Sequence, residues 1–86
     1  MKVLFYSNLL EYTSGEKSYE IEGCARVREL IGAVSDHYGE KLKEFLLRDD
    51  TCLLLVNGKG IMMTGGLDTK LSENDTIEIL TLAEAG

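Results

Sequence analysis

The spacing of apolar residues changes in the middle of this chain, and that change limits the folds it can adopt. From Val27 to Tyr38 the apolar residues recur at steps of three and four, the period of one face of an α-helix. Before and after this segment they alternate or come in short runs, as they do in β-strands. The pattern predicts an α+β domain with a mixed sheet of four to five strands packed on one main helix.

Glycines and short polar turns divide the rest of the chain, which has no proline. Gly39 is expected to end the helix, and a shorter helical segment follows it at residues 42–47. Ser35 is expected on the solvated side of the main helix. The Asn57-Gly58 dipeptide predicts a tight hairpin turn, because both residue types tolerate a positive φ. Strands are expected at residues 2–7, 17–22, 52–56, 61–63 and 76–82.

A chain of 86 residues makes one domain with one apolar core. We expect residues 1–82 to form this domain. Residues 83–86 are Ala-Glu-Ala-Gly, with no apolar side chain large enough to anchor them. They are therefore expected to form a flexible C-terminal tail.

The net charge of −6 argues against two classes of partner. Nucleic acids and anionic membranes are bound mainly through clustered basic side chains, and no cluster here is denser than Lys41 and Lys43. An acidic protein is better suited to a basic groove on another protein. With no leader sequence and no apolar stretch long enough for a membrane span, the expected location is the cytoplasm.

The sequence shows no arrangement of residues typical of a metal, cofactor or catalytic site. Cys24 and Cys52 lie far apart without neighbouring ligands, so both are expected to be reduced thiols. His37 stands alone, and the glycine pairs lack the following helix that a phosphate loop needs. A non-enzymatic protein without a resident cofactor or metal is expected.

Several predicted strands carry apolar residues on both faces, although one helix can cover only one face of a sheet. The second face is therefore expected to bind a partner. The alternative is that residues 42–47, or Met62 and Met63, fold over part of it.

In order and spacing, these segments resemble a known family over essentially the whole chain. The matching segments are the opening strand at residues 2–6, the helix start at 27–31, the hairpin at 56–59, Gly66-Leu67-Asp68-Thr69, and the ending at 74–79 with a short tail to Gly86. The chain resembles the MoaD/ThiS-type sulfur carriers, which have the ubiquitin-like β-grasp fold. MoaD is the small subunit of molybdopterin synthase, and ThiS serves thiamine biosynthesis.

The resemblance implies a function that depends on Gly86. In the family, an E1-like adenylating enzyme uses ATP to activate the C-terminal glycine carboxylate, which is then converted to a thiocarboxylate. The acceptor would be the large subunit of molybdopterin synthase or another sulfur acceptor enzyme. By the same resemblance, Ala83, Glu84 and Ala85 form the arm that enters the partner enzymes. The candidate docking residues are Leu4, Tyr6, Leu80 and Leu82.

Two positions depart from the family pattern. Ala85 replaces the first glycine of a C-terminal pair, and its methyl group in a narrow channel would cost about 1 to 3 kcal/mol. Thr81 and Leu82 stand where many relatives have two prolines. Three alternatives stay open: a ubiquitin-like modifier, a binding module with an inactive tail, and a carrier of the thiamine pathway. Leu80 and Leu82 also fit plain core packing.

Overall fold

A computed structural model describes residues 1–47 and 52–81. Within these residues two α-helices form, α1 (Val27–Tyr38) and α2 (Glu40–Leu46). The strands are β1 (Lys2–Phe5), β2 (Ser18–Glu20), β3 (Cys52–Val56), β4 (Lys59–Gly60) and β5 (Thr76–Thr81). Three short 3-10 helices complete the described chain, η1 (Ser7–Glu11), η2 (Ile61–Met63) and η3 (Gly66–Asp68).

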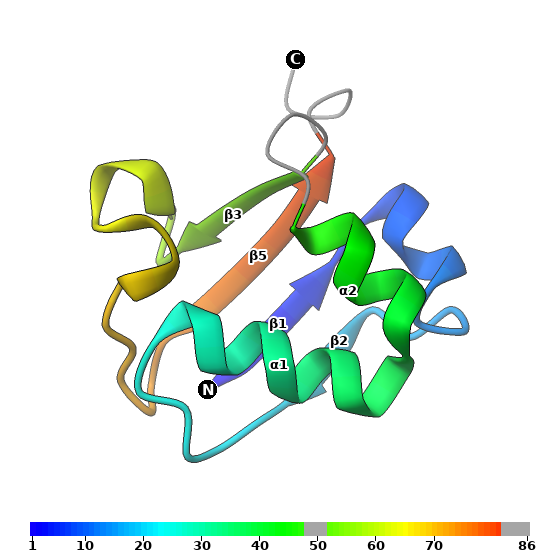
Figure 1. The fold of residues 1–86 in the computed structure, drawn as a ribbon, viewed down its shortest axis with the longest axis horizontal. Coiled ribbons are helices and arrows are strands. Elements are labelled where there is room, and N and C mark those ends of the chain that lie inside the picture. The colour runs from blue at the N-terminus through cyan, green and yellow to red at the C-terminus, as the bar shows by residue number, and fades with distance from the viewer. Residues whose placement is uncertain (48–51, 82–86) are drawn as a thin grey trace.

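The described strands form one mixed sheet with the order β2-β1-β5-β3-β4 (Figure 1). The two strands nearest the chain ends, β1 and β5, pair in parallel, with Leu4 opposite Glu78. All other neighbours are antiparallel, and Leu53 lies opposite Leu80 in the β3–β5 pair. This topology confirms the predicted α+β fold with a mixed sheet.

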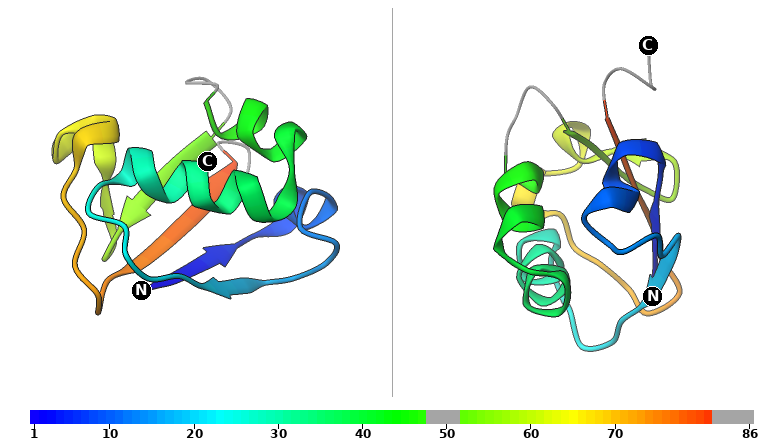
Figure 2. Two further views of the ribbon diagram at one scale, coloured as in Figure 1. Left: turned by 60° about the horizontal axis from the view of Figure 1, so that its bottom comes forward. Right: turned by 90° about the vertical axis from the view of Figure 1, so that its right-hand side faces the viewer.

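Helices α1 and α2 both lie on the same side of the sheet (Figures 1 and 2). The core fills the space between this helical layer and the sheet. Val3 and Phe5 from β1, and Ile77 and Ile79 from β5, point into it and are at most 3% exposed. From the helices it receives Val27, Leu30, Ile31, Val34, Leu42 and Leu46.

Local interactions set the limits of the two helices. The Glu29 carboxylate accepts hydrogen bonds from the backbone N–H groups of Ala25 (2.7 Å) and Arg26 (3.1 Å), which caps the start of α1. Gly39 ends α1 with φ of 117°, a conformation that side chains disfavour, and α2 begins at the next residue. The predicted break at Gly39 is therefore confirmed.

The predicted Asn57-Gly58 turn is also confirmed, since both residues have positive φ, 52° and 85°. The Asn57 side chain holds the turn against the start of β5. Its Oδ1 accepts a hydrogen bond from the Thr76 N–H at 3.0 Å, and its Nδ2 donates one to Asp75 at 2.8 Å.

The strand predicted at residues 61–63 is wrong. The return strand β4 is limited to Lys59 and Gly60, and the chain then turns into the 3-10 helix η2. Met62 and Met63 are 86% and 88% exposed, so the apolar run that suggested a strand is not packed as one. Ile61 is the single β-branched residue of this segment, so its preference for a strand is limited.

The prediction that Ser35 lies on the solvated side of α1 is also wrong, because the residue is buried. Ser35 comes one turn after buried Ile31, so the buried side of α1 is wider than its apolar residues alone indicate. The last strand, β5, is described up to Thr81. Leu82 and the predicted tail at residues 83–86 lie outside the described residues.

Candidate functional site: the open face of the sheet

The described residues place no α-helix on the second face of the sheet (Figure 2). Side chains alternate along each strand, so the neighbours of the core residues point to this face. Six of them are partly exposed. The surface that they form is called the open face, and it comprises Leu4, Tyr6, Leu53, Leu55, Glu78 and Leu80.

Three of the four predicted docking residues, Leu4, Tyr6 and Leu80, come together on the open face. The fourth, Leu82, lies outside the described residues. Sequence reasoning missed Leu53 and Leu55, although their alternation with buried Leu54 and Val56 in the 52–56 run could have indicated them. Their place beside Leu80 and Glu78 follows from the β3–β5 register.

The alternative was that residues 42–47, or Met62 and Met63, fold over part of the open face. The described residues do not support it. Leu42 and Leu46 are buried in the core beneath α2. Met62 and Met63 point into solvent. The partly exposed leucines therefore stay available for contact with another molecule.

Glu78 is an acidic residue at the centre of the open face, between Leu4 and Leu55 in neighbouring strands. The Tyr6 hydroxyl donates a hydrogen bond of 2.8 Å to its Oε2 across the β1–β5 pair. This hydrogen bond, with a smaller contribution from burial, raises the pKa of Tyr6 above its usual value. Tyr6 therefore remains a hydrogen-bond donor at neutral pH.

A hollow of about 350 Å³ opens at the β1 side of this face. It is lined by Leu4, Phe5, Tyr6, Leu10 and Lys17. Most of these side chains are apolar, and Lys17 is exposed. The hollow has the size and the lining to accept one apolar side chain of a partner.

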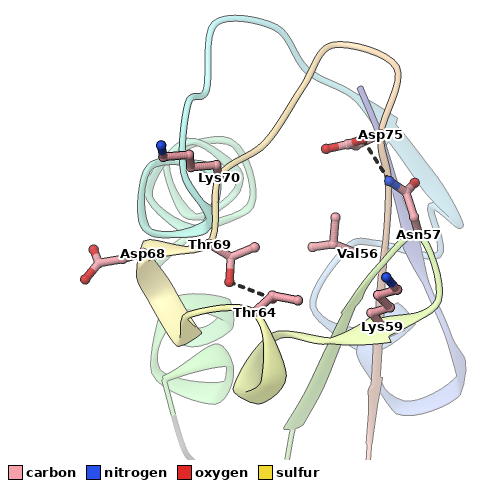
Figure 3. A pocket seen from close by; sticks show the side chains of 8 residues that line it. All are labelled: Val56, Asn57, Lys59, Thr64, Asp68, Thr69, Lys70 and Asp75. Atoms are coloured by element: carbon pink, nitrogen blue, oxygen red, sulfur yellow. Dashed lines mark hydrogen bonds between the residues drawn. The ribbon is translucent and has the colours of Figure 1, made fainter.

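A second hollow of about 480 Å³, lined mostly by polar residue types, lies beyond the β3–β4 turn (Figure 3). The side chains that line it are Val56, Asn57, Lys59, Thr64, Asp68, Thr69, Lys70 and Asp75. The hydroxyl groups of Thr64 and Thr69 are hydrogen-bonded to each other at 3.0 Å, and that of Thr69 also donates to the Gly66 carbonyl at 2.7 Å.

Most polar groups of this second hollow connect loops to one another. The Asp75 carboxylate accepts hydrogen bonds from the Ser72 N–H at 2.7 Å and from Asn57 at 2.8 Å. These two bonds, the backbone one first, lower the pKa of Asp75 below its usual value. Asp68 pairs with Arg28 at 3.2 Å on the exposed surface. The arrangement indicates a structural junction between three loops.

Cys24 is a free, partly buried thiol. Burial, followed by the nearby Glu29 carboxylate, raises its pKa, which keeps it protonated and poorly nucleophilic. Residues 1–47 and 52–81 contain no group of three or more His, Cys, Asp or Glu side chains that could hold a metal ion. Nor does any helix in this part of the chain have the length and apolar character to cross a membrane.

The site residues predicted at the end of the chain, Ala83, Glu84, Ala85 and Gly86, lie outside the described residues. The structure does describe β5, the strand that leads to them. It lies at the centre of the sheet between β1 and β3.

Comparison with solved structures shows the same fold in small proteins of several organisms. One chain of the crystal structure of the Amycolatopsis orientalis BexX/CysO complex has 28% sequence identity and a TM-score of 0.80, covering 93% of this chain and 92% of that chain. Mycobacterium tuberculosis CysO has 23% identity and a TM-score of 0.82, covering 93% and 96%.

The solution structure of small archaeal modifier protein 1 (SAMP1) from Methanosarcina acetivorans has 25% identity and a TM-score of 0.75, covering 93% of this chain and 89% of that chain. A comparison with curated protein sequences found no match. The model of the ThiS family matches residues 3–84, which is nearly the whole chain. The resemblance stated from the sequence is thus confirmed: the fold is the ubiquitin-like β-grasp, and the chain belongs to the ThiS family.

Proposed function

We propose that this protein is a sulfur carrier that acts through the carboxylate of Gly86. An E1-like adenylating enzyme would activate this carboxylate with ATP, and a sulfur donor would then convert it to a thiocarboxylate. The protein itself would be a carrier with no resident cofactor, because ATP is used by the activating partner. We place this cycle in the cytoplasm.

The observation that carries the proposal is the open face on a chain that belongs to the ThiS family. Its apolar residues Leu4, Leu55 and Leu80 give a partner an apolar surface to contact. Docking through this face would hold the carrier while its terminal residues react in the partner.

The position of β5 supports a reaction at the end of the chain. This strand pairs with β1 on one side up to Ile79 and with β3 on the other side up to Thr81. Five residues of chain follow it, and in extended form they reach at most about 18 Å. The carboxylate of Gly86 would thus enter a partner that docks on the open face without the carrier having to unfold.

The chemistry has two balanced steps. In the first, an oxygen of the Gly86 carboxylate attacks the α-phosphorus of ATP, which forms the acyl adenylate and releases pyrophosphate. In the second, hydrosulfide attacks the acyl carbon, a C–S bond forms, the C–O bond to AMP breaks, and one proton is released. Adenylation is needed because a carboxylate oxygen is a poor leaving group, whereas AMP is a good one.

Ala85 and Glu84 would lie in the narrow part of the partner's channel. A methyl group at position 85, where the family pattern has glycine, would slow the first step without removing the reacting group. We propose that the acceptor is the large subunit of molybdopterin synthase. A thiamine-pathway enzyme is the alternative acceptor, and the likeness to CysO is a reason to include further sulfur acceptor enzymes in the test.

Intact-mass spectrometry tests the proposal. The protein would be incubated with an E1-like adenylating enzyme, ATP and sulfide, with a reaction without ATP as the blank. The expected result is the mass increase of one S-for-O exchange. Ala85→Gly, which creates the family's glycine pair, serves as the positive control and should react faster. An unmodified wild type beside a reacting Ala85→Gly variant would contradict the proposal.

A second candidate function is a protein modifier joined to lysine side chains through Gly86. The observation that favours it is the 25% identity to small archaeal modifier protein 1 over most of both chains. Under this reading the adenylated terminus is attacked by an amine, so the same assay with a lysine-rich acceptor protein would yield an isopeptide-linked product instead of a thiocarboxylate.

A further inference from the structure

Any protein that covers the open face must also accommodate the Glu78 carboxylate. In the sheet it lies directly between Leu4 of β1 and Leu55 of β3. Leu80 follows it on the same face of β5, and all four side chains are partly exposed. A partner that contacts these leucines must therefore also remove water from the Glu78 carboxylate.

The carrier satisfies only part of the hydrogen-bonding capacity of this carboxylate. Tyr6 donates one hydrogen bond to Oε2, whereas an ionised carboxylate accepts about four. Among the described residues no lysine or arginine forms an ion pair with Glu78. The ion pair seen in this part of the chain, Arg28–Asp68, is at the other side of the molecule, between α1 and η3.

A purely apolar partner surface would leave this charge buried and unpaired, which is strongly unfavourable. A second copy of this chain is disfavoured as well. Contact between two open faces would enclose two Glu78 carboxylates in one interface, between molecules that each carry a net charge of −6.

We infer that the open face binds a partner surface on which an arginine or lysine, surrounded by apolar side chains, pairs with Glu78. This inference rests on the proposed function and assigns that surface to the E1-like adenylating enzyme. The hollow between Leu4, Tyr6 and Leu10 receives one of the partner's apolar side chains, close to the Glu78 pair. Exposed Lys17 at the rim of the hollow faces an acidic or polar group of the partner.

The Tyr6–Glu78 hydrogen bond prepares the carboxylate for this pair. By holding Oε2 it fixes the side chain and leaves Oε1 available, so less side-chain freedom is lost when the partner binds. Glu78 therefore contributes specificity, because enzymes without a basic residue at the matching place are rejected.

Binding measurements with the adenylating enzyme of the sulfur-loading assay test the inference. Calorimetry would compare the Kd of wild type, Glu78→Gln and Glu78→Lys. Glu44→Lys is the matched control, since it changes the net charge equally but lies on α2 in the helical layer. Thermal unfolding of each variant checks that it is folded.

Glu78→Gln is expected to weaken binding about 10-fold, and Glu78→Lys about 30-fold or more, because it places two like charges together. Glu44→Lys is expected to stay within about threefold of wild type, as for a charge outside the contact. Binding of both Glu78 variants at the strength of Glu44→Lys would overturn the inference.

The two proposals fail in different ways. If wild type gains sulfur and Glu78→Lys binds the enzyme like wild type, the inference fails and the proposed function stands. If wild type neither binds the enzyme nor gains sulfur, both fail. A wild-type dimer that Leu80→Glu dissolves would make a second copy the occupant of the open face and would also overturn the inference.

Discussion

Truncation of two adjacent residues of β5, Ile79 and Leu80, should destabilise the fold to very different extents. Ile79 is fully buried between the sheet and the helical layer, and Leu80 points to the open face. Ile79→Ala removes three carbons worth about 0.8 kcal/mol each and leaves a cavity, for a total loss of about 3 to 4 kcal/mol. Leu80→Ala should cost only about 1 kcal/mol, because the side chain already contacts water.

These losses are large relative to the stability expected of the domain. At about 0.05 to 0.15 kcal/mol per residue, a chain of this length has roughly 4 to 13 kcal/mol in total. For a domain of this size each kcal/mol lowers Tm by about 4 to 8 °C, so Ile79→Ala should lower it by about 12 to 30 °C. Leu80→Ala should lower it by about 4 to 8 °C.

Thermal and urea unfolding followed by circular dichroism would measure both effects, and binding to the adenylating enzyme would be measured on the same samples. Leu80→Ala should weaken binding although it is the milder change in stability. If Leu80→Ala destabilised the fold as much as Ile79→Ala, the open face would be part of the core and the docking argument would be refuted.

Three further changes test particular contacts. Ser35→Ala should raise the free energy of unfolding by about 1 kcal/mol, measured by urea titration. The buried Ser35 hydroxyl has no hydrogen-bond partner among the described residues, and alanine favours helices. A loss of stability would show that the hydroxyl is hydrogen-bonded. Gly58→Ala should lower the free energy of unfolding by about 1 kcal/mol in the same assay, because Gly58 has a φ of 85°, which a residue with a Cβ disfavours. An unchanged stability would mean that the turn rearranges freely. Asp75 has a lowered pKa, so its stabilising effect is present above its unfolded pKa of about 3.9 and is lost as the pH falls through the folded value. Asp75→Asn should therefore lose less stability than wild type between pH 5 and strong acid, and equal losses would contradict the assigned hydrogen bonds.

Local signals in the sequence sufficed for the elements that are defined by neighbouring residues. The helical period of α1, the break at Gly39 and the Asn57-Gly58 turn each depend on residues within a few positions of one another. Alternation along β1 and β5 also separated core residues from those of the open face. These features follow from backbone preference and burial alone.

Features that depend on contacts between distant segments could not be predicted. The burial of Ser35 depends on how α1 packs in the folded domain, which the helical period of α1 alone does not specify. The Tyr6–Glu78 hydrogen bond joins residues 72 positions apart through the parallel β1–β5 pair. At η2 an apolar run was interpreted as a strand, although β3 offers pairing to only two residues of β4.

The central claim is that Gly86 is the reacting residue, and mapping the transferred sulfur tests it most directly. After incubation with the adenylating enzyme, ATP and sulfide, trypsin would release the peptide that follows Lys70, the last lysine of the sequence. Tandem mass spectrometry should place one S-for-O exchange on Gly86, and a variant lacking Gly86 should gain no sulfur. Sulfur found on Cys24 or Cys52 instead, or an unmodified Gly86 under conditions where Ala85→Gly reacts, would contradict the account.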